Sequence, residues 1–309
     1  MLRDAFLTLS HNTAVRNLAT GLPPARRFSR RFVAGETLDD AIAVVRAMNQ
    51  AGVLATLDYL GENVTNPAAA RAYAEEYIGI LDRIQREQVK SNVSLKLTGL
   101  GLDLSTDLAF ENVRRVVSIA RTHDNFVRID MESSDYTDRT LAIYRRLRDV
   151  GFDNVGVVIQ AYLYRSEADI NALIRRGGAN IRLCKGAYDE PEYLAFPRKA
   201  DTDANFVHLM QLLLSPEARQ QGTYAAIATH DDAMITATQA YAAEQDLDRQ
   251  AYEFQMLHGI RTNAQLALVR DGYKMRVYVP YGSHWYPYFM RRLAERPANM
   301  LFLLRNLVR

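Results

Sequence analysis

The chain has 309 residues, of which 48% are hydrophobic and 24% charged, so it is long enough to bury a full core as one large domain or two small ones. Its formal net charge is only +2 with both signs interspersed, which argues against non-specific nucleic-acid binding. No apolar run approaches the roughly 18 residues that a membrane span needs, and the first residues lack a signal-peptide pattern. We therefore expect a cytoplasmic protein whose membrane contact, if any, is peripheral.

The first 36 residues differ from the rest of the chain. They are basic, with Arg26-Arg27 close to Arg30-Arg31, and Gly21-Leu22-Pro23-Pro24 interrupts them. This pattern predicts a small helical arm over 1–36 that leads into a main domain over 37–309.

The main domain is predicted to begin with a helix capped by Thr37, with Asp40 three residues later completing a capping box and Gly52 ending the helix. Strands and helices then alternate. The predicted strands cover 53–57, 93–97, 127–131, 155–160, 180–184, 224–229, 252–256 and 275–279. The helices that separate them are predicted over 68–86, 108–122, 138–149, 167–176, 203–214, 232–244 and 262–270, and a last helix begins near Tyr286.

These strands are nearly continuous apolar runs, as expected when both faces of a parallel sheet are buried. Eight of them alternating with helices predict an α/β fold of the (β/α)8 TIM-like barrel type. A doubly wound sheet is the rival, but its dinucleotide-binding versions need G-x-G-x-x-G at a strand-to-helix turn. The nearest approach here is Gly99-Leu100-Gly101, which lacks the third glycine.

Polar residues follow or end the predicted strands. They are Lys96, Asp130, Gln160, Arg182, Lys185, His230, Gln255 and Tyr278. In a barrel these side chains converge at one end, where ligands bind. The excess of cations among them indicates an anionic ligand or cofactor that carries carboxylate or phosphate groups.

The last helix adds a second group of polar residues. Tyr288, Arg292 and Glu295 share one helical face, and Arg291 lies four residues before Glu295. Such a pair is usually a weak surface ion pair. A helix that directly follows the eighth barrel strand starts at the ligand-binding end, so its arginines can clamp a carboxylate while the glutamate orients one of them.

A family resemblance rests on segments that occur in order along the chain: Ser94-Leu95-Lys96-Leu97, Ile129-Asp130-Met131-Glu132, Gln160-Ala161-Tyr162, Arg182-Leu183-Cys184-Lys185-Gly186-Ala187-Tyr188, Ala228-Thr229-His230, Glu253-Phe254-Gln255-Met256-Leu257-His258-Gly259 and Tyr288…Arg291-Arg292…Glu295. Together they resemble the proline dehydrogenases, and most closely the stand-alone bacterial form. The resemblance implies a distorted barrel that binds FAD non-covalently and oxidises L-proline to Δ1-pyrroline-5-carboxylate. It further implies that the electrons pass to a membrane quinone.

The resemblance also implies roles for individual residues. Asp130 and Arg182 are expected to be catalytic. The expected substrate-binding residues are Lys96, Arg291 and Arg292 on the proline carboxylate, Tyr278 and Tyr288 against the ring, and Glu295 beside the arginines. The expected flavin-binding residues are Met131, Gln160, Arg182, Lys185, Gly186, Ala187, Tyr188, Thr229, His230 and Gln255. Asp189 stands where some relatives carry an aromatic residue.

Three other functions fit parts of the pattern. A Schiff-base aldolase could use Lys96 or Lys185 at a strand end. A metal-dependent hydrolase could use His230, Asp231 and His258, although this is a thin ligand set and no metal is expected. A non-catalytic binding barrel would need only the polar cavity. The lone Cys184 excludes an internal disulfide and is expected to be a small buried strand residue in a reducing cytoplasm, not a nucleophile.

Overall fold

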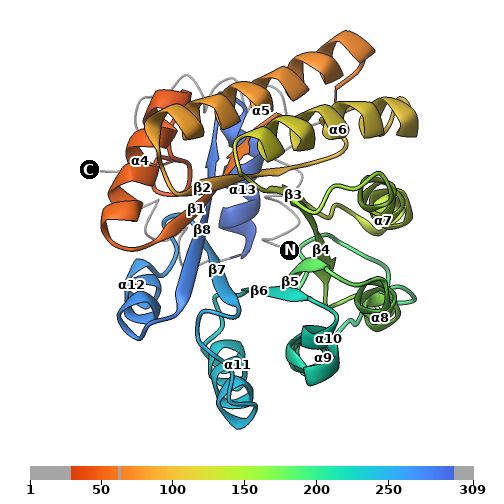
Figure 1. Cartoon of the computed structure of the whole chain (residues 1–309), viewed down its shortest axis with the longest axis vertical. Coiled ribbons are helices and arrows are strands. Elements are labelled where there is room, and N and C mark those ends of the chain that lie inside the picture. Colours follow the sequence, from red (N-terminus) through yellow and green to blue (C-terminus); the bar gives the residue numbers. More distant parts are fainter. Residues whose placement is uncertain (1–28, 62–63, 296–309) are drawn as a thin grey trace.

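A computed structural model describes residues 29–61 and 64–295 of the chain, and within them eight parallel strands close into a barrel in sequence order (Figure 1). The strands are β1 (Leu54–Tyr59), β2 (Ser91–Leu95), β3 (Val127–Ile129), β4 (Val155–Gln160), β5 (Asn180–Cys184), β6 (Tyr224–Ala228), β7 (Glu253–Leu257) and β8 (Lys274–Tyr281). Pairing of β1 with β8 in parallel closes the barrel. The predicted (β/α)8 fold is confirmed.

Helices alternate with the strands along the described residues. They are α4 (Leu38–Gln50), α5 (Pro67–Glu87), α6 (Thr106–Thr122), α7 (Ser134–Asp149), α8 (Ser166–Arg176), α9 (Lys199–Leu214), α10 (Pro216–Gln220), α11 (Asp232–Glu244), α12 (Thr262–Arg270) and α13 (Trp285–Glu295). The helix α10 was not predicted, because five residues are too few to show a helical period. The predicted starts of α7 and α9 are each four residues late.

The first helix begins as its sequence predicts. The amide of Asp40 donates to Thr37 Oγ1 at 3.2 Å, and the amide of Thr37 donates to Asp40 Oδ2 at 3.3 Å, which completes the capping box. The helix α4 then packs against both β1 and β8. It therefore occupies the outer position between the last and first strands.

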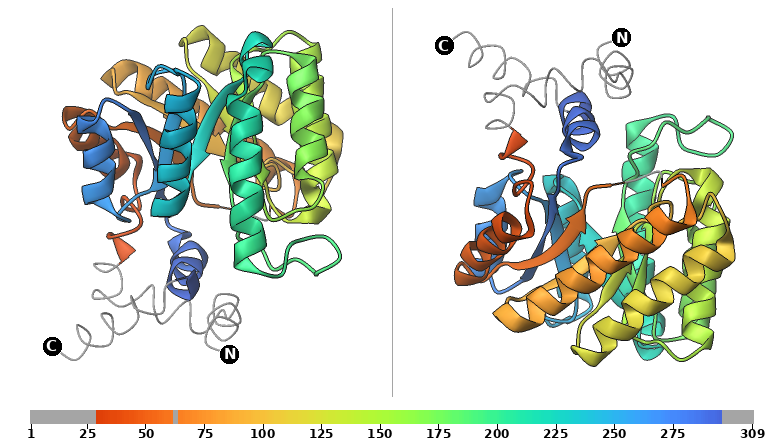
Figure 2. Two further views of the ribbon diagram at one scale, coloured as in Figure 1. Left: turned by 90° about the horizontal axis from the view of Figure 1, so that it is seen from below. Right: turned by 90° about the horizontal axis from the view of Figure 1, so that it is seen from above.

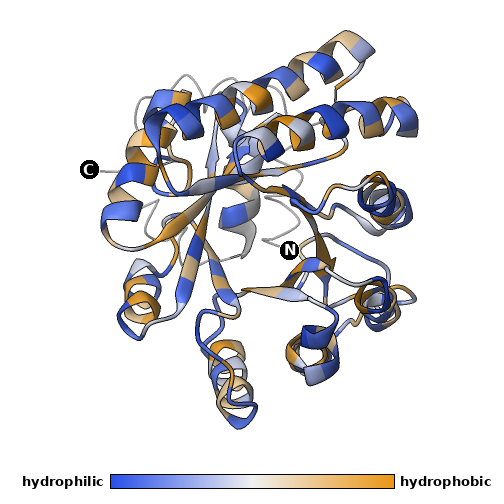
Figure 3. Ribbon diagram, in the orientation of Figure 1, coloured by the Kyte–Doolittle hydropathy of each residue, from blue (hydrophilic) through white to orange (hydrophobic). Residues whose placement is uncertain are grey.

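The hydrophobic core lies between the strands and the ring of helices. Every residue of β4 is buried, as are the central residues of β5 and β6. Figure 3 shows that the helices carry both apolar and polar residues. Their buried residues recur every three or four positions, as Ala109, Val113, Val116 and Ala120 do in α6, so one face of the helix packs on the barrel. Because both faces of the strands are covered, their sequences are apolar at nearly every position.

The final helix departs from the regular ring. Figure 2 shows α13 standing at one end of the barrel instead of beside β8. Its residues Trp285 and Phe289 form a second apolar cluster with Phe32 and Val33, separate from the main core. The rings of Phe32 and Phe289 are 6.2 Å apart. The position of α13 therefore departs from the regular ring of helices in a (β/α)8 barrel.

The predicted arm lies mostly outside the described residues, since 1–28 are not among them, including Arg26 and Arg27. Within the described ranges no helix is long and apolar enough to cross a membrane.

Candidate active site

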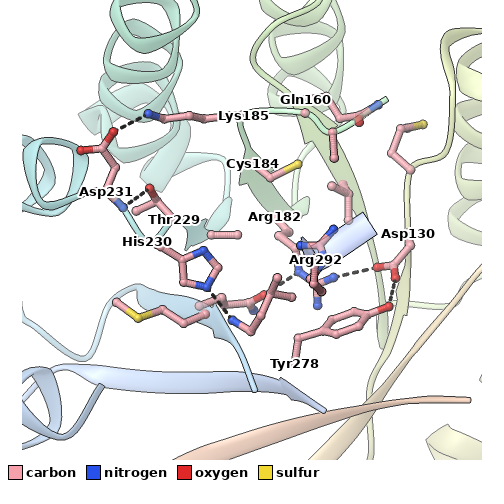
Figure 4. A pocket seen from close by; sticks show the side chains of 18 of the residues that line it. Asp130, Gln160, Arg182, Cys184, Lys185, Thr229, His230, Asp231, Tyr278 and Arg292 are labelled. Atoms are coloured by element: carbon pink, nitrogen blue, oxygen red, sulfur yellow. Dashed lines mark hydrogen bonds and ion pairs between the residues drawn. The ribbon is translucent and has the colours of Figure 1, made fainter. Parts of the chain in front are cut away.

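One large pocket opens at the carboxyl ends of the strands, beneath α13, with a cavity volume of about 680 Å³. The structure brings most of the predicted site residues together around it (Figure 4). Those that line it are Lys96, Asp130, Met131, Gln160, Arg182, Lys185, Gly186, Ala187, Tyr188, Thr229, His230, Gln255, Tyr278, Tyr288 and Arg292. They come from the strand ends, from the loops that follow the strands and from α13, and Lys96 and Tyr278 meet there although 182 residues separate them along the chain.

The structure does not place two of the predicted site residues at the pocket. Arg291 and Glu295 belong to α13, but their side chains lie outside the described part of the structure. Their predicted roles on the carboxylate stay predictions. On the same helix, the Arg292 guanidinium carbon lies 5.2 Å from the centre of the Tyr288 ring, within the range of a cation–π contact.

Arg182 is the centre of the pocket floor. Its Nη1 donates to Asp130 Oδ1 at 2.7 Å and its Nη2 to Ser94 Oγ at 3.0 Å. The two charged side chains are only 7% and 11% exposed, so the pair is desolvated. Ser94 Oγ donates in turn to Asp130 Oδ1 at 3.0 Å. These contacts hold the two terminal nitrogens of the guanidinium group, and the Ser94–Asp130 bond holds their two acceptors together.

Tyr278 extends this network toward the cavity. Its hydroxyl donates to Asp130 Oδ2 at 2.8 Å, and the Arg182 guanidinium carbon lies 5.5 Å from its ring centre. Burial, and then the nearby carboxylates of Asp130 and Asp58, raise the pKa of Tyr278 well above its ordinary value. The phenol therefore stays protonated and can only act as a hydrogen-bond donor to Asp130.

Lys96 has a buried neighbour that the sequence analysis did not identify. Asp58, near the end of β1, is fully buried, and its Oδ1 lies 3.4 Å from Lys96 Nζ. Tyr77 contributes from α5, donating to the carbonyl of Ser94 at 2.8 Å and approaching Asp58 Oδ1 at 3.5 Å. Asp58 is the only acidic residue in β1, and a charged residue in a buried strand is the signal that could have revealed it.

Lys185 lies at the opposite side of the pocket within a cluster of charges. Its Nζ donates to Asp231 Oδ2 at 2.7 Å and also to Asp203, and Lys199 contacts the same two carboxylates. Hydrogen bonding to Lys185, against the opposing effect of burial, lowers the pKa of Asp231 to about 2. Lys185 Nζ is thus engaged by two carboxylates instead of facing a substrate carbonyl, so this arrangement disfavours a Schiff-base role.

The loop between β5 and α9 is held against the pocket by close packing and by a helix cap. Gly186 has φ +112°, and a Cβ there would lie 2.3 Å from the Tyr162 ring, so only glycine fits. Further along the loop, Glu190 accepts a hydrogen bond from the Ser134 amide at 2.7 Å and another from its hydroxyl. Glu190 thus caps α7, where Ser133 makes no side-chain cap.

Cys184 is less buried than the sequence predicts. It ends β5, is partly exposed, and lines the pocket instead of being fully buried. Burial nevertheless raises the pKa of its thiol to about 12, so the thiolate that a nucleophile requires is scarce.

The two histidines of the hydrolase alternative do not form a metal site. His230 Nε2 accepts a hydrogen bond from the Leu257 amide at 2.9 Å, and His258 is not among the pocket-lining residues. Among the described residues, no group of three or more His, Cys, Asp or Glu side chains is placed to hold a metal ion.

His258 gives a prediction for acid stability. Burial lowers its pKa from 6.5 to about 4, and its Nδ1 atom is buried without a hydrogen-bond partner. As pH falls from 6.5 toward 4, the unfolded chain takes up a proton that the folded protein refuses, so the folded state loses stability in this window. We expect His258→Asn to gain in Tm relative to the parent protein as pH is lowered from 7 to 4.5.

Thermal unfolding scans at several pH values measure this effect. His208→Asn, which removes an exposed histidine, serves as the control. A constant Tm difference between the parent and His258→Asn across this range would contradict the prediction.

The fold and the pocket together define a class: a barrel enzyme whose strand ends and final helix bring cationic side chains to one cavity. Comparison with known proteins then identifies the family. Residues 41–305 match the family model described as proline dehydrogenase. The chain belongs to the proline dehydrogenase family and is an oxidoreductase of proline metabolism.

Individual relatives agree with this assignment over the full length. The chain is 45% identical to proline dehydrogenase 1 of Bacillus subtilis (strain 168), covering 100% of both chains, and 37% identical to the proline dehydrogenase of Deinococcus radiodurans, covering 100% of this chain and 98% of the relative. A crystal structure of proline utilization A (PutA) from Bdellovibrio bacteriovorus, inactivated by N-propargylglycine, is similar with a TM-score of 0.83 and 26% sequence identity. That match covers 96% of this chain and 36% of the longer PutA chain.

Proposed function

We propose that this proline dehydrogenase uses FAD to oxidise L-proline to Δ1-pyrroline-5-carboxylate and passes the electrons to a membrane quinone. The observation that carries the proposal is the set of cations around one cavity, Lys96, Arg182 and Arg292, with the tyrosine rings beside them. A carboxylate substrate and a phosphate-bearing cofactor both need such cations.

The residues of the pocket fit a dinucleotide flavin. The cavity volume of about 680 Å³ lies within the range of about 300–1,000 Å³ typical of cofactor sites. The close approach of Gly186 to Tyr162 leaves no room for a side chain and lets the loop backbone reach a ligand. Lys185, Gly186, Ala187 and Tyr188 of this loop would hold the cofactor together with the flavin-binding residues that follow: Met131, Gln160, Arg182, Thr229, His230 and Gln255. FAD would supply the acceptor for a hydride from the carbon beside the proline nitrogen.

Proline would bind between the flavin site and α13. Lys96, Arg291 and Arg292 would hold its carboxylate, with Glu295 orienting the arginines, while Tyr278 and Tyr288 would pack against the ring. A clamp of several cations restricts the substrate to one orientation, which is how binding groups contribute to the rate of a transfer reaction.

The catalytic roles proposed for Arg182 and Asp130 follow from their pairing. Asp130 holds the Arg182 guanidinium and accepts a hydrogen bond from the Tyr278 hydroxyl, which keeps its proton. Arg182 thereby presents a fixed positive charge at the pocket floor, which stabilises negative charge that develops on a bound cofactor. The proline amine must be neutral to react, and solvent can take its proton before the transfer.

The proposal predicts a defined spectrum and a defined electron acceptor. The purified protein should absorb as a flavoprotein, and proline should bleach that absorption without added oxidant. A soluble ubiquinone analogue should then restore it, whereas NAD should not, because the chain has no G-x-G-x-x-G turn for a nicotinamide dinucleotide.

Stopped-flow absorbance with each acceptor in turn measures both steps. Rapid reoxidation by NAD would overturn the acceptor assignment. A colourless protein that borohydride traps with a keto substrate would favour the aldolase alternative, and a colourless protein inert to both would favour the non-catalytic barrel.

Access to a membrane quinone requires contact with the bilayer at the inner face of the plasma membrane. The basic cluster of the predicted arm is our candidate for that contact, at about 1 kcal/mol for each cation near an anionic surface. Arg30 and Arg31 are exposed, whereas Arg26 and Arg27 lie outside the described residues. Co-sedimentation with anionic vesicles tests this step, and unchanged binding after neutralising the four arginines would refute it.

A further inference from the structure

A column of buried polar side chains runs inside the barrel beneath the pocket. Glu253 and Gln255 are two residues apart on β7, so both point to the barrel interior, and each is only 4% exposed. Gln255 lies next to Arg182 on the pocket floor, and Glu253 lies one layer below it.

The amide of Gln255 can have only one orientation in this column. Its Oε1 accepts a hydrogen bond from Arg182 Nε at 2.5 Å, and its Nε2 donates to Glu253 Oε1. Arg182 offers only donors and an ionised Glu253 only acceptors, so a flipped amide would oppose donor to donor above and acceptor to acceptor below. Arg182 and Glu253 therefore favour the same orientation of Gln255, and Glu253 anchors the Nε2 end that does not meet Arg182.

Glu253 is itself held firmly in place. Arg276 Nε donates to Glu253 Oε1 at 2.9 Å and to Oε2 at 3.2 Å, and Arg276 Nη1 donates to the carbonyl of Ala55 at 2.8 Å. The hydroxyl of Tyr224 adds a longer contact to Oε2 at 3.4 Å. Burial raises the pKa of Glu253, but the charge of Arg276 and its hydrogen bonds outweigh burial and lower that pKa, so the carboxylate is ionised.

These contacts connect the lower barrel to the catalytic centre. We propose that Glu253 is a positioning residue that fixes the orientation of Gln255 and, through it, the guanidinium plane of Arg182. The inference deepens the proposed function and rests on the role assigned there to Arg182. With Nη1 on Asp130 and Nη2 on Ser94, the Gln255 contact is the one that holds Nε.

Two substitutions at position 253 separate positioning from charge. Glu253→Met removes the acceptor for Gln255, whereas Glu253→Gln removes the charge but keeps a carbonyl oxygen that Gln255 Nε2 can bond. We expect Glu253→Met to lower kcat about tenfold, the effect of one hydrogen bond to a charged group, with little change in KM because Arg182 is outside the carboxylate clamp. We expect Glu253→Gln to stay within about twofold of the parent protein.

Steady-state kinetics and the midpoint potential of the bound flavin provide the readouts, with Tyr224→Phe as a control that alters Glu253 Oε2 but leaves the acceptor of Gln255 intact. The potential should shift in Glu253→Met and in Arg182→Met in the same direction, and should stay at the parent value in Glu253→Gln and Tyr224→Phe. If Glu253→Met and Glu253→Gln changed kcat and the midpoint potential equally, the charge of Glu253 and not its hydrogen bond to Gln255 would be responsible, and the inference would be overturned.

Combination with Arg182→Met tests whether the effect passes through Arg182. In that background Glu253→Met should change kcat by less than about twofold and should leave the midpoint potential at the Arg182→Met value, since the group it positions is gone. Additive effects would overturn the inference. If the parent protein itself holds no flavin or does not oxidise proline, the proposed function fails instead, so the two failures are distinguishable.

Glu253→Met leaves the Arg276 charge buried without its carboxylate, which can prevent folding. The double variant Glu253→Met/Arg276→Met removes both charges and keeps similar side-chain volume. It also lacks an acceptor for Gln255, so the same loss of kcat and the same shift in potential are expected of it. If this double variant folds and keeps the parent values of kcat and of the midpoint potential, the inference is overturned.

Discussion

Arg182→Met is expected to lower kcat for proline oxidation by about 10²–10³-fold, the usual effect of removing a preorganised donor from a catalytic site. The guanidinium group is buried and bonded to Asp130, Ser94 and Gln255, so no other side chain takes its position when it is removed. Steady-state assays with a soluble ubiquinone analogue measure the loss. Arg165→Met, which breaks a more exposed Arg165–Asp169 pair on the outside of the barrel, is the matched control and should keep parent activity.

Arg182→Met also leaves Asp130 as a buried carboxylate without its cation. Breaking a buried pair in this way costs about 3–5 kcal/mol, so Tm should fall as well. Arg182→Met/Asp130→Asn removes the stranded charge and should recover part of the Tm while activity stays low. Full recovery of kcat together with Tm would show that Arg182 contributes only to stability, against the catalytic role proposed for it.

Arg292→Met is expected to raise KM for proline by about 10- to 150-fold while flavin content is retained. One charge-assisted contact to a carboxylate contributes about 1.5–3 kcal/mol, and Arg292 lines the pocket from α13 instead of from the barrel wall. The residues proposed to bind the flavin lie at or just after the strand ends and on the β5–α9 loop, so removal of the Arg292 guanidinium should leave them in place.

The control for Arg292→Met is Arg86→Met, the same exchange at an exposed position in the last turn of α5. KM for proline and the ratio of flavin to protein absorbance are measured for both. A parent value of kcat/KM in Arg292→Met would show that Arg292 is not part of the carboxylate clamp. Loss of flavin from this variant would show that Arg292 binds the cofactor instead.

Local sequence patterns determined the architecture of this protein. The apolar strand runs, the helical spacing and caps such as Thr37 with Asp40 depend on residues a few positions apart, and all of them appear in the structure. The barrel then follows from the number and order of the elements. Because parallel strands bring their carboxyl ends to one face, polar residues at those ends, from Lys96 to Tyr278, could be expected in one pocket.

Only the tertiary structure decided which side chains pair with one another and where the last helix lies. Asp58 reaches Lys96 across 38 residues, Asp231 reaches Lys185 across 46, and Glu253 acts on Arg182 through Gln255 from another strand. No local period encodes such partners, since they depend on strand register and side-chain rotamers in the closed barrel. Likewise, α13 reads as an ordinary amphipathic helix, but α4 already fills the outer position beside β8, so α13 packs its apolar residues against the 29–36 segment at the barrel end.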